Sequence, residues 1–483
     1  MQKDKLRFER TNACAECMRF KATCGKGTAC SVIRQPLRNY NGIRFTSDGF
    51  DCALPVSIDS HTVCSYGCLY CFSDNLAQHR DNAAKKVGQT KLNKIEGIFS
   101  GKDKSKDAQL IRKALKYDKL KNGYPCPVQL GAICDPLDNI ERNQGWFLKF
   151  IEIAKKYNQP VRISTKGNLF LTDEYINALR EKPHLFRVHF SIISPDDKLI
   201  KQIDKRAPPT SERIESMRRL ESIGVETCLR FRPIIPGLSD ATPDYPNAWK
   251  TLIDMAHKAG CRNISYEVGF VPGHMTGDLL KRWKEIEKIT KVPILQIYKR
   301  FGKTQACIRP HYKWTETIMH NIHDYCKSLG WNIGVSDPVW KQLSECGSCC
   351  AIPENHKVFG NWQTENATNQ LMLARDKGKL ISAKDITPEW AYKTKSDKLY
   401  HPGVGPTVRY KRKHETWADK LFNVWTDLTR ERGPLQYFQG ALLPFKKLTN
   451  GDILFKYIGL KRSYPKQTPY WKIKPWKKKS KNK

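Results

Sequence analysis

Three cysteines in one short loop constrain this chain more than any other feature of its sequence. Cys64, Cys68 and Cys71 are spaced four and then three residues apart, so their thiols lie within reach of one small inorganic centre. Iron–sulfur clusters are held by thiolates, and a cubane with only three protein ligands keeps one iron open for a cofactor or substrate atom. The alternatives are a zinc site or cysteines buried in a core. The loop therefore predicts a [4Fe–4S] cluster with an open iron.

The segments after residue 50 predict an α/β fold, because short β-branched runs alternate with longer amphipathic segments. We expect strands at residues 53–58, 128–133, 161–165, 186–193, 227–233 and 264–271. We expect helices between them, such as residues 144–156, 211–224 and 248–260. Six strands in this order predict a partial (β/α)6 TIM-type barrel, with its chemistry at the C-terminal ends of the strands.

An aromatic residue, Phe72, directly follows the last cysteine of the loop. With it, the C-x3-C-x2-C spacing resembles the signature of the radical SAM superfamily. The resemblance implies that S-adenosylmethionine (SAM) chelates the open iron through its amino and carboxylate groups. It also implies that reduction of the cluster releases a 5′-deoxyadenosyl radical, which abstracts a hydrogen atom from the substrate. An electron donor such as flavodoxin or ferredoxin is then an expected partner.

Four downstream motifs resemble the spore photoproduct lyase and DNA repair photolyase branch of this superfamily. They are VHFSI at residues 188–192, IDKRAPP at 203–209, SERI at 211–214 and RPIIPG at 232–237. The resemblance covers roughly residues 50 to 350 and implies a lyase-type enzyme that repairs a DNA photoproduct. The branch usually has Glu where this chain has Asp204, so the role of that carboxylate stays open.

The resemblance also implies contacts with the cofactor. Phe72 would pack beside the adenine, and Ser191 and Lys166 would contact the methionyl end of SAM. Each residue also has a plain interpretation, as a buried aromatic, a capping serine and a surface lysine. A lysine directly after a β-rich strand is expected at the active face.

The end of the second expected strand, Cys134-Asp135, lacks the Gly-Gly-Glu that many radical SAM enzymes carry there. Spore photoproduct lyase lacks it too and has a cysteine followed closely by an aspartate, with a different spacing. The resemblance implies that Cys134 returns a hydrogen atom to the product radical, that Tyr70 passes it on, and that Asp135 contacts the cofactor. The alternative for Cys134 is a buried structural thiol.

The first 45 residues contain four cysteines among lysines and glycines, with little apolar periodicity. Cys14 and Cys17 form a CxxC pair, and Cys24 and Cys30 follow it. This pattern predicts a metal knuckle, either a four-thiolate zinc site or a second iron–sulfur cluster.

A third group of cysteines follows the expected barrel. Cys346, Cys349 and Cys350 lie within five residues. They are candidates for a second metal site completed by Cys307, by Cys326 or by the N-terminal four, or for closing the barrel mouth near the cofactor.

The charge of the chain indicates a polyanionic partner. A net charge of +36, from 84 Lys and Arg against 48 Asp and Glu, is the electrostatic footprint of a nucleic-acid binder, and we expect DNA rather than RNA. The alternative is a solvated, lysine-rich surface. Seventeen cysteines without a signal-like apolar stretch indicate a reducing, cytoplasmic location. The sequence has no run of about 18 apolar residues, so we expect no membrane span.

The composition divides the chain into three expected parts: a Cys-rich metal-binding segment at 1–45, a radical SAM core at 46–355 and a basic, aromatic-rich region at 356–483 that contacts nucleic acid. In the last part, Trp417, Leu421, Trp425 and Leu428 predict a packed amphipathic helix over residues 415–431. The tail at 471–483 is cationic with two tryptophans, which suits phosphates and stacking.

These observations favour a radical SAM enzyme that acts on a nucleic-acid base, with DNA photoproduct repair as the reaction. One alternative is a radical SAM enzyme that modifies a base of DNA or tRNA with an auxiliary cluster. Another is a non-catalytic, metal-stabilised nucleic-acid-binding protein. A second cluster would favour the base-modifying enzyme, and a lack of SAM cleavage would favour the non-catalytic protein.

Overall fold

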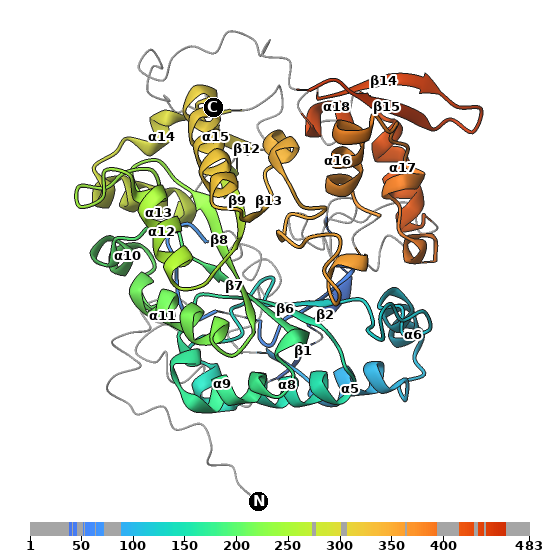
Figure 1. The fold of residues 1–483 in the computed structure, drawn as a ribbon, viewed down its shortest axis with the longest axis horizontal. Helices are drawn as coiled ribbons and strands as arrows, with labels where there is room; N and C mark the ends of the chain where they lie inside the picture. Colours follow the sequence, from blue (N-terminus) through green and yellow to red (C-terminus); the bar gives the residue numbers. More distant parts are fainter. Residues whose placement is uncertain are drawn as a thin grey trace, which may run out of the picture.

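The computed structural model describes twelve stretches of the 483-residue chain. They are residues 38–40, 42–45, 52, 54–62, 64–71, 88–272, 277–300, 307–362, 365–393, 415–428, 433–438 and 441–459. Figure 1 shows how their helices and strands are arranged.

An eight-stranded sheet forms the centre of the fold, in the order β13-β9-β8-β7-β6-β5-β3-β2. Neighbouring strands are parallel except for β2 and β3, which are antiparallel. In chain order the strands are β2 (Ile43–Phe45), β3 (Val56–Ile58), β5 (Val128–Leu130), β6 (Val161–Thr165), β7 (Phe186–Ser191), β8 (Glu226–Ile234), β9 (Asn263–Val268) and β13 (Asn332–Val335).

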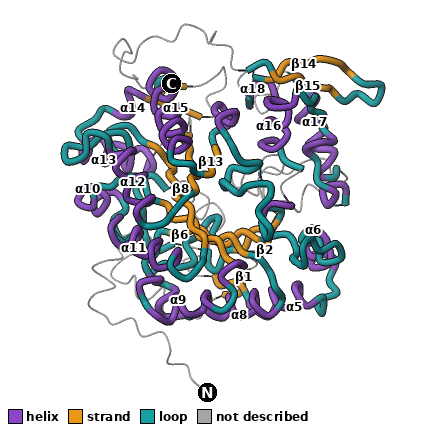
Figure 2. Tube along the Cα trace, in the orientation of Figure 1, coloured by secondary structure: helices purple, strands orange, loops and turns teal. Residues whose placement is uncertain are grey.

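Helices cover one face of this sheet, and Figure 2 shows the strands running between them. Apolar side chains of β6 and β7, such as Ile163 and Val188, share one buried core with helix residues such as Phe150 and Leu220. The longer helices are α5 (Leu92–Ser100), α6 (Lys106–Ala114), α8 (Trp146–Lys156), α9 (Asp173–Arg180), α10 (Asp197–Ile203), α11 (Thr210–Glu221), α12 (Ala248–Lys258), α13 (Gly277–Thr290) and α15 (Tyr312–Ser328).

Smaller elements complete this part of the fold. A parallel pair joins β1 to β4, and a three-stranded sheet has the order β10-β12-β11. The bounds are β1 (Arg38–Tyr40), β4 (Gly88–Thr90), α7 (Glu141–Gln144), β10 (Val271–Pro272), α14 (Ile294–Ile297), β11 (Tyr298–Arg300) and β12 (Cys307–Pro310).

The α/β expectation is confirmed, because all six predicted strands are present in chain order in a mostly parallel sheet. Three predicted helices are also present, as α8, α11 and α12. The sequence missed β13 and β2, which extend the sheet at its two ends. Both are short, and β2 lies before residue 46, where we expected the core to begin.

A second, smaller core lies in the C-terminal part of the described chain. Its apolar side chains come from α16 (Ala367–Lys377), α17 (Trp417–Thr426) and the hairpin of β14 (Leu442–Lys447) with β15 (Ile453–Tyr457). The short helix α18 (Pro434–Tyr437) precedes the hairpin. The packed helix predicted over 415–431 is present as the shorter α17, which buries Trp417, Leu421 and Trp425. Leu428 lies beyond its end and is exposed.

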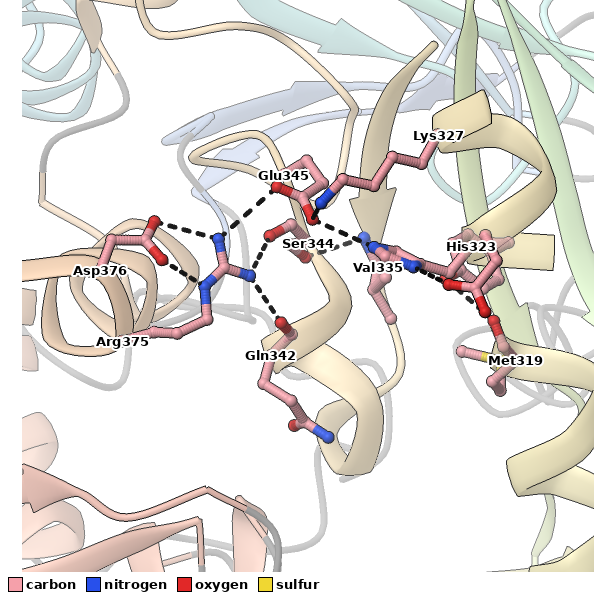
Figure 3. Close-up of polar contacts among 11 residues, drawn as sticks. Met319, His323, Lys327, Val335, Gln342, Ser344, Glu345, Arg375 and Asp376 are labelled. Carbon is pink, nitrogen blue, oxygen red and sulfur yellow. Dashed lines mark hydrogen bonds and ion pairs between the residues drawn. The ribbon is translucent and has the colours of Figure 1, made fainter. Parts of the chain in front are cut away.

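A polar network joins this smaller core to the main sheet (Figure 3). The Arg375 guanidinium of α16 donates to the carbonyls of Gln342 at 2.6 Å and Ser344 at 2.8 Å, and it pairs with Glu345 at 3.7 Å. Glu345 also accepts hydrogen bonds from Lys327 at 3.0 Å and His323 at 3.1 Å, both on α15. The helix α16 is thereby tied to the segment that follows β13.

None of the helices that the structure describes is both long enough and apolar enough to cross a bilayer.

Candidate active site

The three-cysteine loop follows β3 and turns tightly. Cys68 is buried, whereas Cys64 and Cys71 are partly exposed, and all three are free thiols. Gly67 has a φ of 63°, a left-handed conformation that glycine adopts readily. The Cys71 N–H donates to the Cys68 carbonyl at 3.1 Å, so the last two cysteines close a turn.

Two hydrogen bonds anchor the loop on both sides. The Ser65 N–H donates to the Asp138 carboxylate at 2.6 Å, after β5, and the Leu69 N–H donates to the carbonyl of Ile203, the last residue of α10, at 3.0 Å. Burial raises the pKa of Asp138 to about 7, against the hydrogen bond from Ser65. The position of the cysteines is therefore set by segments from β5 and α10.

The donor chemistry of the loop fits an iron–sulfur cubane. Thiolate sulfurs are the ligands that hold such clusters, and the loop supplies three thiols. In the described part of the chain, no three Cys, His, Asp or Glu side chains gather closely enough to hold a single metal ion. The thiolates of a cubane bind three different irons, so they stand farther apart than the ligands of one ion. Cys64, Cys68 and Cys71 stay the predicted cluster ligands.

Lys166, directly after β6, connects the cysteine loop to a buried carboxylate. Its ammonium group lies 2.5 Å from the Tyr70 hydroxyl and 3.0 Å from Asp204 Oδ2. Tyr70 lies between the second and third cysteines. Burial and the Asp204 charge raise the pKa of Tyr70 well above its usual value, so the phenol keeps its proton.

Asp204 is shared by two cations. Arg213 of α11 donates to the same carboxylate oxygen at 3.0 Å, and Asp204 and Arg213 are fully buried. Burial alone raises the pKa of Asp204, but Lys166 and Arg213 outweigh it and hold that pKa well below its usual value. The trio therefore carries one net positive charge. Arg213 Nη2 is buried and has no partner among the described residues, so the site offers a donor to an anionic group such as the carboxylate of SAM.

Ser191 and Asp135 meet this network through their hydrogen bonds. The Ser191 carbonyl, at the end of β7, accepts from Arg213 at 2.9 Å and from Lys166 at 3.4 Å. Asp135 accepts from the Thr165 hydroxyl at 2.7 Å and from the Lys166 N–H at 2.6 Å. Asp135 therefore holds the backbone from which the Lys166 side chain extends, and its contact with the cofactor stays a prediction.

Cys134 lies in a different set of contacts. Its thiol is buried, 3.5 Å from the Ser60 hydroxyl and 3.9 Å from Asp59. Burial and the Asp59 charge raise the pKa of the Cys134 thiol, so it keeps the S–H bond that a hydrogen-atom donor needs. Among the described residues no hydrogen bond joins Cys134 to Tyr70, and their predicted cooperation stays a prediction.

Two residues of the site received no role from the sequence. Arg213 was part of a motif that carried the family resemblance, but nothing in the sequence indicated that it meets Asp204 nine residues away. Asp59, directly after β3, accepts hydrogen bonds from the N–H groups of Ala132 and Ile133 at 2.9 and 2.8 Å. The sequence signal that could have identified Asp59 is a carboxylate directly after a strand.

The third cysteine group lies against the sheet on the side of β9 and β13. The Cys349 carbonyl accepts from the Ser265 hydroxyl of β9 at 2.6 Å, and the Cys346 N–H donates to the Ile333 carbonyl of β13 at 3.1 Å. A hydrogen bond from Cys349 lowers the pKa of Cys350 to about 6, against the effect of burial. Their predicted metal site stays a prediction.

Several predicted site residues lie outside the described part of the chain. They are Phe72 and the N-terminal cysteines Cys14, Cys17, Cys24 and Cys30.

Part of the chain matches a known protein family. The Radical SAM superfamily profile matches residues 58–245, a range that includes the cysteine loop, Lys166, Ser191, Asp204 and Arg213. This chain contains a radical SAM domain. A domain of this superfamily implies an enzyme that uses a [4Fe–4S] cluster and SAM. A search of curated proteins returned no match.

Solved structures similar to this chain include spore photoproduct lyase complexes. One, with bound AdoMet and dinucleoside spore photoproduct, has 14% identity and a TM-score of 0.42 over 60% of this chain and 78% of the lyase. Another, Streptococcus suis SuiB bound to precursor peptide SuiA, has 11% identity and a TM-score of 0.34 over 59% of this chain and 49% of SuiB. At these identities and TM-scores the similarities establish no shared substrate or reaction.

Proposed function

We propose that this radical SAM enzyme acts on a nucleic-acid base and that its reaction is repair of a DNA photoproduct. One observation carries the proposal: the three-cysteine loop is joined through Tyr70 to Lys166, at the end of β6. The net charge of +36 supports a polyanionic substrate. The four motifs between residues 188 and 237 support the spore photoproduct lyase-like branch.

The residues of the site have separate tasks in this proposal. Cys64, Cys68 and Cys71 hold the cluster, and Lys166 with Arg213 provides positive charge for the methionyl carboxylate. When bound, the cluster and SAM supply a reductive cleavage that ends in hydrogen-atom abstraction from the substrate. Cys134 keeps a thiol S–H bond for return of a hydrogen atom.

We also infer the partners of this enzyme and its location. The electron comes from a small donor protein such as flavodoxin or ferredoxin. Nucleic acid is bound through its phosphates, and DNA is the substrate rather than RNA. An enzyme with an oxygen-sensitive cluster and free thiols fits the reducing cytoplasm.

Anaerobic reconstitution tests the proposal. The protein is reduced with dithionite in the presence of SAM and of ultraviolet-irradiated DNA, undamaged DNA or tRNA, and 5′-deoxyadenosine and digested nucleosides are measured by mass spectrometry. We expect loss of a thymine photoproduct from irradiated DNA alone. A new nucleoside in undamaged DNA or tRNA would contradict repair and favour base modification with an auxiliary cluster at the third cysteine group. Absence of 5′-deoxyadenosine with every substrate would favour a non-catalytic binding protein.

A further inference from the structure

One face of the sheet carries an unusual set of basic residues. On β6, β7 and β8, the apolar residues Ile163, Val188 and Leu229 belong to the main core, which they share with the helices. Side chains alternate between the two faces of a strand, so the intervening residues face the other side. The register pairs Arg162 with Arg187. It also pairs Ser191, at the active edge, with Arg230.

Arg187 has a carboxylate partner and a structural role. Its guanidinium donates to Glu226 at 2.5 Å and to the Ala351 carbonyl at 2.7 Å. It thereby fastens the segment after Cys350 to β7. The other basic groups on this face differ from Arg187 in their partners.

Arg162 and Arg230 have no carboxylate partner in the part of the chain that the structure describes. Arg162 is 1% exposed and bonds only to the Ser164 hydroxyl. Arg230 makes no hydrogen bond or ion pair to a described residue. Burial, Arg232 and Arg162 lower its pKa, against the charges of Cys350 and Glu267. Arg232 bonds to the Ser336 hydroxyl and lies 3.6 Å from Glu267, so it is partly neutralised.

His189 lies among these arginines. Its side chain is 0% exposed, and neither ring nitrogen has a partner among the described residues. Burial, followed by the charges of Arg162, Arg187, Arg230 and Arg232, lowers its pKa well below the usual value. The imidazole is therefore neutral, with one N–H left to donate. We call Arg162, His189, Arg230 and Arg232 the interior arginine cluster.

The Cys350 thiol, whose pKa Arg162 and Arg232 help to lower, supplies one negative charge beside this cluster, and a further anion would stabilise it. A desolvated charge without a partner costs several kcal/mol, and two arginines here lack a carboxylate. The planar guanidinium fork matches the oxygens of phosphate or carboxylate bidentately. Arg230 is in register with Ser191, and successive residues of a strand rise by only about 3.3 Å. An anion bound here would lie close to the radical site.

We propose that the interior arginine cluster binds a phosphate group of the substrate, with Arg162 and Arg230 as its main ligands and His189 as a neutral donor. The identity of the ligand as a nucleotide rests on the proposed function. The phosphate next to the reacting nucleotide would be held inside the sheet, while the base faces the cysteine loop. The expected substrate is a nucleotide or a strand with an extruded nucleotide, and a free nucleoside would bind poorly.

Binding experiments on the full chain test this directly. Thermal shift with inorganic phosphate, and calorimetry with thymidine 5′-monophosphate and thymidine, are compared for wild type, Arg230→Gln and Arg162→Gln. Arg218→Gln is the control, because Arg218 is exposed and pairs with Glu215 on the surface of α11. We expect phosphate to raise the Tm of the wild type and the control. We expect the monophosphate to bind them at least about tenfold tighter than thymidine, which corresponds to about 1.4 kcal/mol.

The two cluster variants should lose both effects. Without phosphate, Arg230→Gln should melt at the same temperature as the wild type or higher, because it removes an unpaired charge. A phosphate response retained in both variants, or absent from the wild type, would overturn the proposal. A second outcome would also overturn the proposal. If the protein contained more iron than one cubane holds, if the EPR spectrum of that iron changed in the variants, and if phosphate had no effect, the arginines would belong to a second cluster. Phosphate binding needs no SAM cleavage, so its failure is separable from failure of the proposed function.

Discussion

Asp204 is the residue on which the charge balance of the active site depends. Its side chain is fully buried and neutralises part of the charge of Lys166 and Arg213, both at 3.0 Å. Removing one partner of a buried ion pair leaves an uncompensated charge, which costs about 3–5 kcal/mol. The short Asp204 side chain reaches both cations.

Asp204→Asn should therefore lower the free energy of unfolding at neutral pH by about 3 kcal/mol. The folded-state pKa of Asp204 lies below its unfolded value of about 3.9. Its contribution is therefore present above about pH 4 and is lost as the pH falls below that value. Urea unfolding between neutral pH and acid checks this, with Asp173→Asn as the control, because Asp173 is exposed and pairs with Arg219. Equal stability of the Asn variant and the wild type at pH 7 would show that the pair contributes nothing.

Cys134→Ala should bind and cleave SAM normally, because neither step uses this thiol. The substrate radical would then lack its hydrogen donor, so 5′-deoxyadenosine should accumulate in excess of product, and adducts with solution reductants should appear. Product analysis on the true substrate measures this, and Cys126→Ala, which removes another buried thiol, is the control. An unaltered product ratio with a stability loss of about 1 kcal/mol would make Cys134 a packing residue.

The sequence could indicate the site residues that directly follow strands or cysteines, but not their partners. Lys166 and Tyr70 were expected near the cofactor, and the structure joins them. The contact of Arg213 with Asp204 depends on how α10 and α11 fold back on the end of β7. Arg162 and Arg230 looked like ordinary strand residues, because their lack of carboxylate partners appears only when β6, β7 and β8 are aligned.

Among the elements, the strands predicted from the sequence are those with long β-branched or aromatic runs. Strands β6 and β7 are buried along their whole length, so their sequences differ clearly from the neighbouring helices. β13 has four residues including Gly334, so its sequence shows no clear strand pattern. Its hydrogen-bonded pairing with β9 defines it as a strand. Its glycine leaves room for the backbone of Ala351, with which an added Cβ would clash.

The contact between α16 and the segment after β13 rests on Arg375 (Figure 3). Arg375→Met should leave the carbonyls of Gln342 and Ser344 without their donor and lower the free energy of unfolding by about 2 kcal/mol. Hydrogen exchange should also become faster in α16. Lys377→Met on the same helix is the control, because Lys377 is exposed. Unchanged exchange in α16 would show that its apolar face alone holds it in place.

At the scale of the whole molecule, the charge of +36 predicts that interactions with phosphates dominate nucleic-acid affinity. Seven of the last twelve residues are lysines, in a tail that lies outside the described residues. Removal of residues 471–483 should weaken DNA binding and reduce the slope of log K against log salt by about 0.9 for each phosphate that the tail neutralises. Fluorescence anisotropy at several salt concentrations measures both. An unchanged affinity and slope would identify the tail as a solvated end.

The central claim is that the loop of Cys64, Cys68 and Cys71 holds the cluster at which SAM is cleaved. The most direct measurement is 5′-deoxyadenosine formed from SAM and dithionite by anaerobically reconstituted wild type, Cys68→Ala and Cys326→Ala. Cys326 is a buried core thiol and serves as the matched control. We predict that the wild type and Cys326→Ala form 5′-deoxyadenosine, whereas Cys68→Ala forms none and loses the EPR signal of the reduced cubane. Reductive cleavage retained in Cys68→Ala would contradict the assignment of the active centre.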